Sequence, residues 1–138
     1  MTVRGHACKS DVETALCKEM GRQRLPHEHR SLQFRVLDGR GGSKDYSPAI
    51  VARRGPILFL VEPVDKKRGM VDLLQRFLEQ HSPEIVHVVV APVDLVDRIP
   101  HGAYDEIYAA SDLSGLTARI REQDPEGIVR PFEKPRPR

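Results

Sequence analysis

Apolar residues recur at every third or fourth position in three segments of the chain. The first segment, 10–22, begins with a capping box, in which Ser10 accepts from the Glu13 amide and the Glu13 carboxylate reaches back. Segment 69–81 carries the strongest apolar stripe, and 111–121 carries a shorter one. The pattern therefore predicts three helices.

Five other segments have the apolar patterns of β-strands. One alternates between apolar and polar residues, as a half-buried strand does. Two short apolar runs flank a turn with Gly55 and Pro56 and predict a β-hairpin. A continuous run interrupted by His87 is typical of a strand covered on both faces, and His87 is expected to be a hydrogen-bonded core histidine. The predicted strands are 33–37, 50–52, 57–61, 85–91 and 106–110.

The order of these elements is α-β-β-β-α-β-β-α. It predicts an α/β fold with a mixed sheet of about five strands and helices on both faces, a three-layer α/β/α sandwich. Segment 38–43 contains three glycines and is expected to be a hairpin connection. We expect one domain over 1–126 and an extended, proline-rich, charged tail over 127–138.

Composition narrows the class of protein. The chain has 138 residues, and 39% are apolar and 30% charged, as in ordinary globular proteins. No window approaches the roughly 18 apolar residues of a membrane span, and the N-terminus lacks the apolar stretch of a secretory signal. A cytoplasmic location without membrane association is expected. The two cysteines, Cys8 and Cys17, form no CxxC pair and are predicted to be free, structurally incidental thiols.

Acidic residues stand at two conspicuous places. Glu13 lies on the first helix, and Glu62-Pro63-Val64 ends the third strand, whereas Pro48-Ala49 opens the second. With the order of elements over about residues 10–110, this arrangement resembles the restriction-endonuclease-like, PD-(D/E)XK superfamily of nucleases. The resemblance implies a DNA-acting domain in which helix and strand carboxylates hold Mg²⁺ or Mn²⁺ beside the scissile phosphate.

The motif departs from that superfamily at two positions. Ala49 stands where the resemblance expects Asp, and Val64 where it expects Lys, so the domain is predicted to be catalytically degenerate. Metal-dependent phosphodiester hydrolysis stays open if Asp45 and Lys66 take over these roles. The candidate catalytic residues are Glu13, Asp45, Glu62 and Lys66, and the candidate metal ligands are Glu13, Asp45 and Glu62.

Charge adds a candidate nucleic-acid surface. The formal net charge is only +2, from 22 basic and 20 acidic residues, but basic residues cluster around the central hairpin. A solvated polar surface is the alternative interpretation. The candidate phosphate-binding residues are Arg30, Arg53, Arg54, Lys67 and Arg68.

Other interpretations of the same residues stay open. Glu13 can simply complete its capping box, and Glu62 can mark the point where a strand leaves the core. Residues 27–30, His-Glu-His-Arg, are expected to be a polar loop, although His27 and His29 would share a face on a strand and two imidazoles suit a transition metal. The alternative function is a noncatalytic binding or assembly module with a protein partner or a second copy of the chain.

Overall fold

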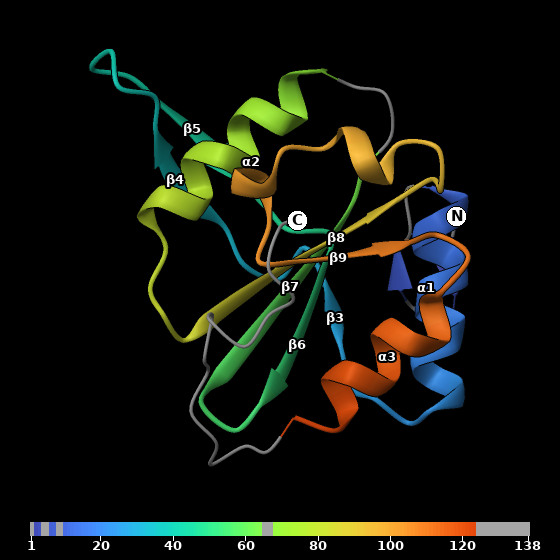
Figure 1. Cartoon of the computed structure of the whole chain (residues 1–138). Helices are drawn as coiled ribbons and strands as arrows, with labels where there is room; N and C mark the ends of the chain where they lie inside the picture. Colours follow the sequence, from blue (N-terminus) through green and yellow to red (C-terminus); the bar gives the residue numbers. More distant parts are fainter. Residues whose placement is uncertain (1, 4–5, 8–9, 65–67, 124–138) are drawn as a thin grey trace.

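A computed structural model describes residues 2–3, 6–7, 10–64 and 68–123, and shows an α/β fold around a five-stranded mixed sheet (Figure 1). Neighbours pair antiparallel from β3 to β7 and parallel from β7 to β9. The predicted mixed sheet of about five strands is therefore confirmed. In spatial order its strands are β3 (Glu28–His29), β6 (Ile50–Arg54), β7 (Ile57–Pro63), β8 (Ile85–Ala91) and β9 (Glu106–Ala109).

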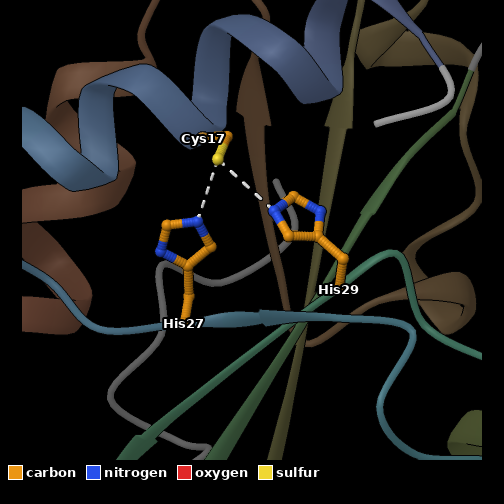
Figure 2. A group of neighbouring side chains, drawn as sticks. All are labelled: Cys17, His27 and His29. Atoms are coloured by element: carbon orange, nitrogen blue, oxygen red, sulfur yellow. Dashed lines mark hydrogen bonds between the residues drawn. The ribbon is translucent and has the colours of Figure 1, made fainter. Parts of the chain in front are cut away.

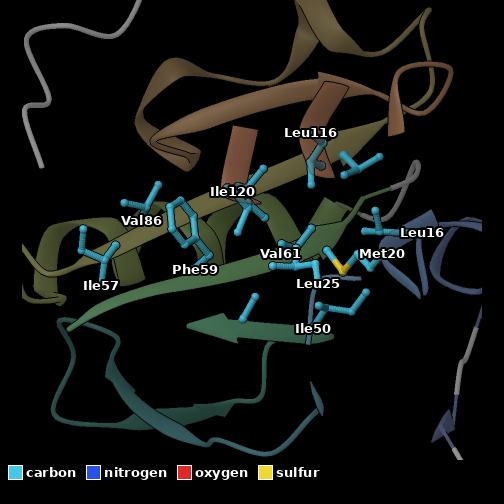
Figure 3. Close-up of a cluster of buried hydrophobic side chains, with 13 residues drawn as sticks. Leu16, Met20, Leu25, Ile50, Ile57, Phe59, Val61, Val86, Leu116 and Ile120 are labelled. Carbon is cyan, nitrogen blue, oxygen red and sulfur yellow. The ribbon is translucent and has the colours of Figure 1, made fainter. Parts of the chain in front are cut away.

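The three predicted helices are present, and they cover both faces of the sheet. They are α1 (Asp11–Arg22), α2 (Arg68–Gln80) and α3 (Leu113–Arg121). Helices α1 and α3 lie side by side on one face, where Leu16 and Ile120 belong to the same buried cluster as Phe59 (Figure 3). Helix α2 covers the other face, where Leu74 packs against Leu60. Phe59 and Leu60 face opposite layers because successive side chains of a strand alternate.

The alternating segment 33–37 forms a strand, but it lies outside the main sheet. Strand β4 (Phe34–Leu37) pairs only with β5 (Ser43–Tyr46) in a separate hairpin, which projects from the body beside α2 (Figure 1). Val36 and Tyr46, on its inner face, are buried against the α2 side of the core. The predicted order of elements placed segment 33–37 in the main sheet, and that placement is wrong, because β3 forms the edge of the main sheet instead.

Smaller elements complete the described chain. Strands β1 (Thr2–Val3) and β2 (His6–Ala7) pair with each other, and two 3₁₀ turns, η1 (Val96–Arg98) and η2 (His101–Ala103), join β8 to β9. Among the described residues, no helix is long and apolar enough to cross a bilayer. The predicted tail, 127–138, lies outside the described residues.

Candidate metal centre

The segment that leads from α1 to β3 is fixed by the way the helix ends. The Leu25 amide donates to the Met20 carbonyl at 2.8 Å and the Arg24 amide donates to the Gly21 carbonyl at 3.1 Å. These two bonds are those of a Schellman motif, which requires a left-handed residue just past the helix; here that residue is Arg24, with φ 61°. The buried Leu25 then directs the chain back along α1 toward β3.

This return brings three side chains together that are scattered in the sequence. Cys17 projects from α1, and His27 and His29 project from the β3 segment toward it, with all three donor atoms within 4.8 Å of one another (Figure 2). The Cys17 Sγ lies 3.2 Å from His27 Nε2 and 3.4 Å from His29 Nε2. The two imidazoles share a face because alternate residues of an extended chain point the same way.

The opposite nitrogen of each imidazole is already hydrogen-bonded. The His27 Nδ1 lies 3.0 Å from the Leu25 carbonyl oxygen, and the His29 Nδ1 lies 2.6 Å from Glu13 Oε2. Because a carbonyl or carboxylate oxygen can only accept, each Nδ1 carries the proton and donates it. Both Nε2 lone pairs are thereby directed at the Cys17 sulfur, as in metal-binding histidines with fixed tautomers.

The donor set suits Zn²⁺. One thiolate and two imidazoles are the ligands that Zn²⁺ prefers, whereas Mg²⁺ and Mn²⁺ prefer oxygen. Bond lengths of about 2.3 Å to sulfur and about 2.0 Å to nitrogen, at a tetrahedral angle, place those ligand atoms about 3.5 Å apart. The observed sulfur to nitrogen separations of 3.2 and 3.4 Å are close to that spacing, and Cys17 is only 5% exposed.

Glu13, a candidate ligand for a hard cation, lies beside this cluster. It is 1% exposed and accepts from the Arg30 guanidinium at 2.8 Å (Oε2) and 2.6 Å (Oε1), besides its bond with His29. The Ser10 hydroxyl accepts from the Glu13 amide at 3.1 Å, which confirms the first half of the predicted capping box. The carboxylate turns inward to Arg30 and His29, so the reciprocal half of the box is wrong.

Glu62, at the end of β7, is buried in the α2 side of the core. Its Oε1 accepts from the Tyr46 hydroxyl at 3.0 Å and from the Ala49 amide at 3.2 Å. Burial raises the pKa of Glu62 to about 7, against the lowering effect of both hydrogen bonds and of nearby Arg30. The negative charge of Glu13 adds to the effect of burial and raises the pKa of Glu62 further.

His87 contacts the same Tyr46 hydroxyl as Glu62 and is fully buried, as expected of a core histidine. Its Nε2 lies 2.7 Å from the Tyr46 hydroxyl oxygen. Burial lowers the pKa of His87 to about 3, so the imidazole is neutral in the folded protein at physiological pH. Glu62, Tyr46 and His87 therefore form one buried polar network between the sheet and α2.

The remaining candidate catalytic residues are placed differently. Asp45 is exposed and stands across the hairpin from Arg35, on the face opposite to the inward-pointing Tyr46. Ala49 and Val64 are both buried. Lys66, like Lys67 of the nucleic-acid set, lies outside the described residues.

The proposed basic surface is divided. Arg53 and Arg54 lie at the turn between β6 and β7, at the opposite end of both strands from Glu62. Arg53 is exposed, and the Arg54 Nε donates to the Gln123 carbonyl at 3.4 Å. Arg30 is engaged by Glu13, and Arg68 is the first residue of α2. Arg53 and Arg54 therefore lie apart from Glu62, whereas Arg30 is bonded to the other acid, Glu13.

Comparison with known proteins adds no relative. The chain matches no family model, no curated protein and no solved structure.

Sequence reasoning missed the grouping of Cys17 with His27 and His29. The Cys17 thiol faces both imidazoles, and residues 27–30 contain the strand Glu28–His29 instead of a polar loop. A signal was present: Cys17 lies one helical turn after Glu13, on the same face of the predicted helix. The pairing of that face with His27 and His29 depends on the turn at Arg24, which no apolar pattern reveals.

Proposed function

We propose that the protein binds a Zn²⁺ ion through Cys17, His27 and His29, and that the ion fastens α1 to the edge strand β3. The observation that supports this most is the direction of the two imidazoles. Each presents Nε2 to the Cys17 sulfur while its Nδ1 is held by a fixed acceptor. Two such tautomers aimed at one thiol form a preorganised ligand set.

A stabilising role follows from the elements that the ligands join. Strand β3 pairs with β6 through only two residue pairs, Glu28 with Val51 and His29 with Ile50. So short a strand contributes little pairing energy of its own. An ion bound to α1 and to the β3 segment would hold this edge in place, and its binding energy would add to the folding energy.

Metal content tests the proposal directly. Protein purified from zinc-supplemented cells should carry about one Zn²⁺ per chain by mass spectrometry, and Cys17→Ser and His27→Asn should each lose most of it. His101→Asn is the matched control, because His101 is exposed and lies outside the cluster. A wild-type protein that neither retains zinc nor takes it up after refolding with the metal would contradict the proposal.

We propose further that the three-layer arrangement is restriction-endonuclease-like and that the domain binds DNA without cleaving it. The supporting observation is that Arg30 occupies both oxygens of Glu13, the acid that the resemblance expects on the first helix as a metal ligand. Affinity for duplex DNA should fall steeply with salt, and Mg²⁺ or Mn²⁺ should elicit no product. Cleavage that is lost in Glu62→Gln would instead favour a working nuclease. Failure to retain DNA at low salt would favour the assembly module, with a protein partner or a second copy of the chain.

A further inference from the structure

We propose that Glu13 is a positioning residue of the zinc centre, and that Arg30 holds Glu13 in that role. This role rests on the proposed zinc site. Glu13 and Arg30 would hold the ligand His29 in position without binding the metal themselves. The acid that the resemblance suggests as a ligand for a hard cation would thus act on a different metal indirectly, through a hydrogen bond to one of its ligands.

The geometry of α1 places Glu13 where this role requires it. Glu13 and Cys17 are four residues apart and therefore project from the same face of the helix. The Glu13 Oε2 accepts the His29 Nδ1 proton at 2.6 Å, which leaves the His29 Nε2 lone pair facing Cys17. One turn of helix thus carries both a ligand and the group that orients another ligand.

Arg30 explains how a buried carboxylate is kept in place. Its guanidinium makes two bonds to the Glu13 oxygens, and a carboxylate as deeply buried as this one requires a paired cation. The Arg30 amide also donates to the Ala49 carbonyl at 3.2 Å, which ties the same residue to the start of β6.

The backbone conformation of Arg30 indicates that surrounding contacts hold this residue in place. Its φ is 51°, a left-handed conformation that is unfavourable for a residue with a side chain. Such conformations persist where surrounding contacts hold them. Here the contacts are the hydrogen bond from the Arg30 amide to Ala49 and the ion pair with Glu13. These contacts hold the Arg30 guanidinium, which stays charged, against the Glu13 carboxylate.

Replacing Glu13 by glutamine tests the role, because the amide keeps the shape and removes the charge. Zinc affinity, measured by competition with a chromogenic chelator, should weaken about 10- to 100-fold. Glu19→Gln is the matched control on the same helix, since Glu19 pairs with the surface residue Arg22, and its zinc affinity should equal that of the wild type.

Nitrogen NMR of His29 gives a second readout that a purely structural role would not change. Wild-type apoprotein should hold His29 as the Nδ1–H tautomer, and Glu13→Gln should lose this preference. If Glu13→Gln does not fold, Arg30→Lys, which keeps the charge and removes the two-point contact, should weaken zinc binding by a smaller factor than a ligand substitution does.

The outcomes separate the two proposals. Unchanged zinc affinity in folded Glu13→Gln or in Arg30→Lys would overturn the positioning role and leave the zinc site intact. A wild-type protein that binds no zinc would overturn the site itself, and the positioning role with it.

Discussion

Arg24 shows how a single residue directs the chain into the metal centre. It occupies the left-handed position of the Schellman motif, where glycine is favoured because it has no Cβ. The Arg24 side chain therefore lowers stability at the position where the chain turns from α1 toward His27.

We predict that Arg24→Gly stabilises the protein by about 1 kcal/mol, since glycine adopts this conformation without strain. Urea unfolding of zinc-loaded protein measures the change. Arg22→Gly, two residues earlier and inside α1, should instead destabilise, because glycine weakens a helix. A loss of stability in Arg24→Gly would show that the Arg24 side chain makes a stabilising contribution larger than its backbone strain.

Glu62 makes stability depend on pH. Its pKa is about 7 in the fold and about 4.5 when unfolded, so the folded protein binds the proton more tightly. This contribution is fully present below about pH 4.5 and is lost as the pH rises through 7. It amounts to about 3 kcal/mol.

Glu62→Gln should remove this dependence. The unfolding free energy of wild type minus that of the variant should fall by about 3 kcal/mol between about pH 4.5 and pH 8. A difference that does not change with pH would mean that Glu62 is ionised throughout.

At the residue scale, the sequence predicted the Ser10 cap and the buried, hydrogen-bonded His87. It did not predict what Glu13 contacts. A capping box is a local pattern, whereas the bonds to His29 and Arg30 span 16 and 17 residues and depend on the whole turn between α1 and β3.

At the element scale, β3 is the shortest strand of the main sheet, and it carries His29 of the proposed zinc site. Its two residue pairs with β6 give it little independent stability. The proposed ion compensates for this by joining the strand to α1, which is itself packed on the core through Leu16 and Met20.

Removing zinc should therefore loosen β3 before it unfolds the protein. Hydrogen exchange of the Arg30 amide, which donates to Ala49, should accelerate after chelation, while β7 and β8 amides stay protected. The Val89 amide in central strand β8 is a suitable internal control. Equal acceleration at both amides would indicate global destabilisation, and no change at Arg30 would contradict the fastening role.

Elements with strong periodicity were predictable, and β3 was not. Helix α2 begins at Arg68 and β8 spans Ile85–Ala91, close to the predicted 69–81 and 85–91, because their apolar patterns are long and regular. Strand β3 has two polar residues, and its position follows from the turn before it and from pairing with β6. Segment 33–37 had the better strand pattern but packs against α2 instead.

For the whole molecule, two apolar clusters on opposite faces of one sheet define the fold, and two polar networks lie within it. The pair of Glu13 and Arg30 and the cluster of Cys17, His27 and His29 join α1 to the β3 segment, whereas Glu62, Tyr46 and His87 join the sheet to the β4–β5 hairpin. Arg30 belongs to the first network and lowers the pKa of Glu62 in the second. The cysteine and histidine cluster beside Glu13 suits a different metal from the carboxylate site that the resemblance implies.

X-ray absorption at the zinc edge of the purified protein tests the central claim most directly. The account predicts at least one sulfur neighbour at about 2.3 Å and imidazole nitrogens at about 2.0 Å, with the sulfur signal reduced in Cys17→Ser. A first shell made only of oxygen, or a spectrum that is unchanged in Cys17→Ser, would contradict the assignment of Cys17, His27 and His29 as the zinc ligands.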